Sequence, residues 1–147
     1  MTYATRADIE AIYGANHLAT LVAHDVDLDV AVGRALDAAA RQMEPYLRKR
    51  YRLPLPAGAS AMLMQCAIDI ACWQLAPAGD RISEQIEKRA KLRLEFLREL
   101  AAGKVDLVEL DSYLLQPAAE GTVSEGSTSG AAFSADQRRW PAGGDML

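Results

Sequence analysis

The chain has 147 residues and a formal net charge of −4, from 16 lysines and arginines against 20 aspartates and glutamates. This length fits one domain, with or without a tail. The mild acidity argues against a dedicated duplex-DNA binder, because such proteins concentrate Lys and Arg on one surface. No apolar run reaches the roughly 18 residues of a membrane span, and no signal peptide is visible. We therefore expect the protein to stay in the compartment where it is made.

Half of the residues are apolar and only 6% are aromatic, which favours a helical core rich in alanine and leucine. The first helix is predicted over residues 6–13, with Thr5 as its N-cap and Gly14 as the residue that ends it. A shorter helix should follow, with Asn16 as its cap. The N-terminal segment therefore predicts two short helices in succession.

The third predicted helix is the longest and covers residues 28–51. Pro45 lies inside it and predicts a kink or break near residues 41–44, because proline lacks a backbone donor and clashes with the carbonyl four residues earlier. One face carries a ladder of charges of alternating sign, spaced by three and four residues: Arg34, Asp37, Arg41, Glu44 and Arg48. This face is either solvated or meets a neighbouring subunit, where the same charges would fix orientation.

The fourth predicted helix begins at residue 59 or 60, ends at residue 75, and is apolar around most of its girth. Such a helix belongs in the centre of a bundle. Asp69 lies on its narrow polar stripe and is either a surface carboxylate or a partly buried one that needs a partner. The nearest basic residues in sequence are Arg48, Arg50 and Arg52. We predict that one of them, with Arg50 as the candidate, forms a structural ion pair with Asp69.

The fifth predicted helix covers residues 81–102, with Asp80 as its cap and Gly103 as the residue that ends it. The composition changes after it. We therefore divide the chain into a helical domain, residues 1–115, and a Gly/Ser-rich tail, residues 116–147. The tail has too few large apolar residues to offset its ordering entropy alone.

The tail nevertheless contains a segment that differs from polar filler, residues 133–140. It holds two aromatic residues and two arginines: Phe133, Arg138, Arg139 and Trp140. Trp and Arg are over-represented where binding energy concentrates. The segment is therefore either an anchor for a partner or a disordered terminus with an incidental tryptophan.

The sequence contains no glycine-rich phosphate loop, no nucleophile elbow and no HExxH motif, so we expect no enzyme, cofactor or metal. Cys66 and Cys72 are best explained as buried apolar residues in a reducing cytoplasm, and His17 and His24 as surface or capping residues. The basic run at residues 48–52 either contacts phosphates or is the cationic end of a helix. It supports an alternative function, a small helical nucleic-acid-binding or regulatory module.

These patterns together predict an all-α fold, a small bundle of about five helices with a long kinked third helix, an apolar central fourth helix and a low-complexity C-terminal tail. A series of short motifs also runs through the chain in order: Tyr3-Ala4-Thr5, Asp8-Ile9, Tyr13-Gly14, Ala35-Leu36-Asp37-Ala38-Ala39, Tyr46-Leu47, Arg50-Tyr51, Pro54-Leu55, Asp69-Ile70-Ala71, Leu100-Ala101-Ala102-Gly103-Lys104 and Phe133-Ser134. The series resembles the Mu-like prophage family of small head–tail connector (neck) proteins. Pro45 departs from that family's pattern, which is usually helix-compatible there.

The resemblance implies a non-enzymatic structural protein of a tailed phage or prophage, made in the bacterial host cytoplasm and located in the neck of the virion. It implies side-by-side assembly as a dodecameric ring between the portal protein and tail-side neck proteins. It also implies that DNA passes through the lumen without sequence-specific binding, and that no membrane is involved. In this setting the third-helix ladder would contribute to subunit packing, and the tail anchor would fold on a neighbour.

Overall fold

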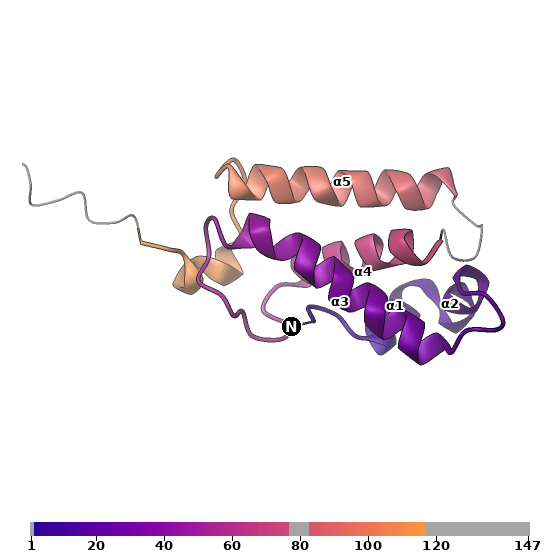
Figure 1. The fold of residues 1–147 in the computed structure, drawn as a ribbon. Coiled ribbons are helices and arrows are strands. Elements are labelled where there is room, and N and C mark those ends of the chain that lie inside the picture. The colour runs from indigo at the N-terminus through magenta and orange to yellow at the C-terminus, as the bar shows by residue number, and fades with distance from the viewer. Residues whose placement is uncertain (1, 77–82, 117–147) are drawn as a thin grey trace, which may run out of the picture. The chain divides into compact units, whose positions relative to one another are not determined.

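The computed structural model describes residues 2–76 and 83–116, and these belong to one compact helical unit, Met1–Leu115. Within the described residues the structure has five α-helices, one 3-10 helix and no strand, which confirms the predicted all-α fold (Figure 1). The elements are α1 (Arg6–Tyr13), α2 (Ala15–Leu21), α3 (Leu28–Leu47), α4 (Ala61–Leu75), α5 (Glu84–Ala101) and the 3-10 helix η2 (Val108–Tyr113). The tail anchor predicted at residues 133–140 lies outside the described residues.

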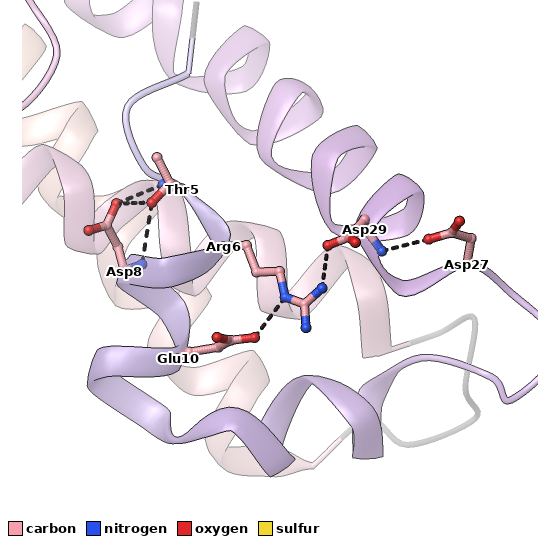
Figure 2. A network of polar contacts seen from close by, with 6 residues as sticks. All are labelled: Thr5, Arg6, Asp8, Glu10, Asp27 and Asp29. Atoms are coloured by element: carbon pink, nitrogen blue, oxygen red, sulfur yellow. Dashed lines mark hydrogen bonds and ion pairs between the residues drawn. The ribbon is translucent and has the colours of Figure 1, made fainter.

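Thr5 caps α1, as the sequence predicts, and Asp8 completes a reciprocal capping box with it (Figure 2). The backbone N–H of Asp8 donates to the hydroxyl of Thr5 at 3.4 Å, and its carboxylate accepts from the Thr5 backbone N–H at 2.8 Å. Gly14, at φ +88°, ends α1 and directly precedes α2. The prediction that Asn16 caps the second helix is wrong, because the turn at Gly14 is so tight that Asn16 already lies inside α2.

Helix α3 continues through Pro45 to Leu47, so of the two outcomes predicted at this proline, a kink or a break, the break does not occur. The reason is position, since Pro45 lies in the last turn and removes only the bond to the Arg41 carbonyl. Both Arg41 and Pro45 are exposed, so water can hydrate that carbonyl. The next bond is intact, with the N–H of Arg48 donating to the carbonyl of Glu44 at 2.8 Å.

Helix α4 is the centre of the unit, as its apolar sequence predicts, and it packs against both α3 and α5. Ser60 caps it by accepting from the Met62 N–H at 3.2 Å. Its buried residues lie on all sides of the helix, and they are Leu63, Cys66, Ala67, Ile68, Asp69, Ile70, Ala71, Cys72 and Leu75. A helix enclosed in this way fixes the positions of the surface helices around it.

Helix α5 begins after Ser83, whose hydroxyl accepts from the Ile86 N–H at 3.3 Å. The prediction that Asp80 caps this helix is therefore wrong, since an N-cap directly precedes the first turn; Asp80 itself lies outside the described residues. At the other end Gly103, at φ +76°, closes a Schellman motif, as predicted. The N–H of Lys104 there donates to the carbonyl of Glu99 at 3.0 Å.

The segment after α3 is joined to the end of the described chain rather than continuing the helix to residue 51. Tyr51 and Leu114 form an isolated antiparallel bridge. The N–H of Arg52 donates to the carbonyl of Tyr113 at 2.6 Å, and the N–H of Leu115 donates to the carbonyl of Arg50 at 2.8 Å. These bonds hold η2 and the residues beyond it against the C-terminal end of α3.

Candidate functional site

The charge ladder lies on the side of α3 that faces away from the core. The buried residues of the helix, such as Val32, Leu36 and Met43, occupy its opposite side. Four ladder residues are exposed and one is half-buried: Arg34, Asp37, Arg41 and Arg48 in the first group, and Glu44 in the second. The structure therefore places the whole ladder on one continuous face, as the spacing predicts.

The charges of the ladder are mostly unpaired within the described part of the chain. Glu44 and Arg48 form an ion pair with a separation of 3.5 Å, and the Arg48 side chain is 72% exposed, so this pair contributes little to stability. Arg34, Asp37 and Arg41 make no ion pair with any residue in ranges 2–76 and 83–116. Three charges of mixed sign on a rigid helix are thus free to meet another molecule.

A shallow hollow of about 320 Å³ adjoins the C-terminal end of the ladder. It is lined by Tyr3, Glu44, Arg48, Leu53 and Pro54. Burial and the nearby Glu44 carboxylate raise the pKa of the Tyr3 phenol, so its hydroxyl stays protonated and can donate a hydrogen bond. The hollow has the mixed apolar and charged lining that could receive a side chain from a neighbouring protein.

The basic run at residues 48–52 is only partly exposed, because Arg50 is half-buried and Tyr51 is buried. Tyr51 is only 1% exposed and cannot stack on a nucleic-acid base. Arg50 is a structural clasp, because its Nη1 donates to the carbonyls of Leu100 at 3.3 Å and Val105 at 2.8 Å. Its Nη2 pairs with the carboxylate of Asp106. The clasp satisfies carbonyls at the end of α5, where a cation is favoured.

Asp69 is buried, being 2% exposed, and has a basic partner, but the partner is Arg93 and not Arg50. The Nε of Arg93 donates to its carboxylate at 2.7 Å. Tyr13 also donates to it from its hydroxyl, and Gln65 donates from Nε2 at 3.1 Å. The predicted Arg50–Asp69 pair is wrong because sequence proximity misleads here, since Arg50 follows the end of α3 whereas α5 packs directly along α4.

Sequence reasoning missed Arg93 and a second arginine of α5, Arg89, which stacks on the Tyr13 ring with its guanidinium carbon 5.0 Å from the ring centroid. The ring of His17 lies 5.0 Å from that of Tyr13. Burial, and then the charge of Arg89, lower the pKa of His17. A signal did exist, since Arg89 and Arg93 lie beside Ala90, a buried position on the core-facing stripe of α5.

The family model of bacteriophage Mu Gp36 matches residues 3–125. The chain belongs to the bacteriophage Mu Gp36 family. No curated protein sequence is significantly similar to it. This Gp36-family chain is therefore a phage protein, and the match includes every described helix and both faces of α3. The match ends before the tail segment at residues 133–140.

Two further features of this Gp36-family chain concern its chemistry. Cys66 and Cys72 are free and buried, as predicted, and burial raises the pKa of each thiol to about 12. In the two ranges that the structure describes, no three His, Cys, Asp or Glu side chains are grouped as metal ligands. No helix there has the combined length and apolar character of a bilayer crossing.

Proposed function

We propose that this phage protein is a structural head–tail connector, a neck adaptor that assembles as a twelve-membered ring between the portal protein and the tail-side neck proteins. Membership of the Gp36 family supports a phage role, and the helical unit supports a role through shape and surface. The protein acts without catalysis, cofactor or metal. In the virion, subunits stand side by side in the neck and DNA passes through the lumen.

The observation that carries the proposal is the exposed ladder of α3. Arg34, Asp37 and Arg41 are held on a rigid helix and have no ion-pair partner in the described residues. Charges arranged in this way favour one orientation of a neighbour and disfavour others, because like charges brought together cost free energy.

The charge balance of the chain suits a DNA passage. With a net charge of −4 the protein lacks the excess of cations that makes duplex binding strong and salt-dependent. A channel for moving DNA benefits from weak attraction, since tightly bound phosphates would slow transit. The rival function, a nucleic-acid-binding or regulatory module, loses its key group because Tyr51 is buried and Arg50 is occupied.

The test is a light-scattering measurement of molar mass over a concentration series, with the protein alone and with a portal-containing fraction. The proposal expects a ring-sized species that appears or increases when portal is added. A protein that does not bind portal contradicts the proposal, whether or not it self-associates. Salt-dependent binding to duplex DNA by the purified protein would instead support the rival function.

A further inference from the structure

A second charged face, on α5, has the same residue spacing as the ladder of α3. Its charged members and one large apolar residue are all exposed: Lys88, Lys91, Leu92, Glu95 and Arg98. Two shallow hollows, of about 340 and 420 Å³, lie along this face. Leu92 is 54% exposed and lies among these charged residues, so its apolar side chain is accessible to a partner. The face is therefore shaped and composed to receive another surface.

The two ladders match in sequence register. The first four ladder residues of α3 correspond to the charged α5 residues 54 positions later, and both series follow spacings of three, four and three residues, whereas the fifth, Arg48, corresponds to the uncharged Ala102. Each pair of facing residues forms one level of the contact. Three successive levels have opposite charges: Asp37 with Lys91, Arg41 with Glu95, and Glu44 with Arg98. At the same register Ala38 lies opposite the exposed Leu92.

One level of the register brings like charges together, Arg34 with Lys88. In this register Arg34 also lies within one turn of Glu84, and both basic side chains are long and exposed. The three central levels therefore determine how the two faces fit. At this outer level the two long side chains can turn away from each other.

The fold presents the two helices in the direction that this register needs. Within one subunit α3 and α5 run in the same general direction but are inclined to one another, and α4 runs in the opposite direction (Figure 1). Their C-terminal ends are level, because Arg50, just after α3, donates to the carbonyl of Leu100 near the end of α5 at 3.3 Å. A ring relates copies by rotation with no shift along its axis. Helix ends that are level along that axis in one subunit therefore stay level between neighbours.

We propose that the ladder face of α3 in one copy packs in parallel on the α5 face of the next copy, through the levels Asp37–Lys91, Arg41–Glu95 and Glu44–Arg98. This contact joins two different faces, so it is head-to-tail and closes a ring when the rotation allows. The inference rests on the proposed connector function and deepens it by naming the two surfaces that meet.

The experiment uses Arg41 and Glu95, because neither makes an ion pair within the described residues. Full-length R41E, E95R and the double variant R41E/E95R are compared with the wild type by sedimentation velocity over a concentration series. Each single variant places like charges opposite one another in every contact, so we expect at least a tenfold weaker self-association. The double variant, and a 1:1 mixture of the two single variants, restore opposite charges in every contact and should recover it.

The mixture is the decisive measurement, because only a contact between two different faces lets two defective chains rescue each other in alternation. Matched controls are K104E and D25K, which change the net charge by the same amounts at exposed positions outside both faces. Circular dichroism melting shows that each variant is folded. A second pair, D37K with K91D, repeats the design one level away, and its melting curves also report the loss of the exposed Lys91–Glu87 ion pair, which is 2.6 Å long in the wild type.

The outcomes separate this inference from the proposed function. Loss in the single variants with rescue in the mixture supports the face pairing. A wild type that assembles while the single variants assemble equally well overturns the pairing and leaves the connector function standing. A wild type that stays monomeric at every concentration also overturns it, because faces of this complementarity should associate unaided. Failure to bind portal is the separate result that contradicts the connector function.

Discussion

At Asp69 one carboxylate joins three helices, because it accepts from Tyr13 of α1, from Gln65 of its own helix α4 and from Arg93 of α5. The carboxylate is 1% exposed and the Arg93 side chain 27% exposed, so this ion pair is largely withdrawn from solvent. Removing one partner of such a pair leaves the other charge uncompensated, which costs more than the pair itself contributes.

We therefore expect Asp69→Ala to lower the free energy of unfolding by about 3 kcal/mol, the lower end of the range for a broken buried pair because Arg93 keeps some solvent. Tyr13→Phe, which removes one hydroxyl donor, should cost about 1 kcal/mol. Guanidinium denaturation followed by circular dichroism measures both. A cost for Asp69→Ala no larger than that for Tyr13→Phe would show that Arg93 contributes nothing to the pair.

His17 gives the protein a predictable response to acid. Burial, and secondarily the charge of Arg89, lower its pKa below the ordinary value of 6.5, so the folded protein binds this proton less readily than the unfolded chain. As the pH falls through 6.5 the unfolded chain takes up the proton first, and stability contributed by the neutral ring is progressively lost. We expect the unfolding free energy to decrease from about pH 7 to pH 5 and His17→Gln to reduce that slope.

The matched control for this pH dependence is His24→Gln, because His24 is exposed whereas His17 is half-buried. Denaturation curves at a series of pH values should give the same slope for His24→Gln as for the wild type. An unchanged slope in His17→Gln would assign the acid response to carboxylates instead.

At the scale of the elements, Arg50 links the ends of α3 and α5. It donates to the carbonyl of Val105, to the carbonyl of Leu100, which also accepts from the Gly103 N–H, and to the carboxylate of Asp106. Hydrogen bonds to a charged group contribute more than neutral ones, so we expect Arg50→Met to cost about 2 kcal/mol of stability. Hydrogen exchange at the Leu115 N–H, which donates to the Arg50 carbonyl, should become faster.

Two further substitutions serve as controls for the stability loss expected of Arg50→Met. Arg52→Met removes an exposed arginine of the same run and should leave both stability and exchange unchanged. Arg50→Lys keeps the charge but loses the planar fork, and should recover only part of the stability. If all three variants matched the wild type, the clasp would have no energetic role.

The beginnings and ends of helices could be read from the sequence where the signals are local. Thr5 with Asp8 specifies the start of α1, and Gly14 and Gly103 specify ends, because these signals act within one turn of the chain. Pro45 misled because its effect depends on the distance to the helix end. A cap signal can be read within one turn, whereas the effect of a proline can be judged only once the end of the helix is known.

Contacts between elements were less predictable, because they depend on which helix packs beside which. The sequence showed that Asp69 needed a cation but offered three arginines near α3, whereas packing supplied Arg93 from α5. The same limit applies to Arg6, which pairs with Glu10 at 2.7 Å within α1 and also with Asp29 of α3 (Figure 2). The first pair follows from helical spacing, and the second requires the fold.

At the scale of the whole molecule, the described unit presents two different charged helix faces while its interior is closed. The α3 and α5 faces carry charges of both signs, whereas the central α4 is apolar and its thiols have pKa values of about 12. Surfaces with mixed charge give orientation more than raw affinity. Such faces suit a protein whose copies must take one arrangement, and they leave affinity for other partners to additional segments.

The segment predicted to supply that affinity is residues 133–140, with aromatic and arginine anchors at Phe133 and Trp140 and at Arg138 and Arg139. Deleting residues 131–147 should leave the melting temperature of the helical unit within about 2 °C of the full chain, because every element described in Figure 1 ends before residue 116. Assembly into particles should fall, since Trp and Arg concentrate binding energy.

The deletion is measured in two assays, thermal melting of the purified chain and assembly of intact particles by negative-stain microscopy and infectivity. A matched full-length variant, Phe133→Ser with Trp140→Ser, keeps tail length and charge and should reproduce the loss if the aromatic residues are the anchor. Intact particles built by the truncated chain would remove the tail from the assembly mechanism. A truncated chain that melts far below the full chain would instead make the tail part of the fold, because its removal would then take away stabilising contacts with the helices.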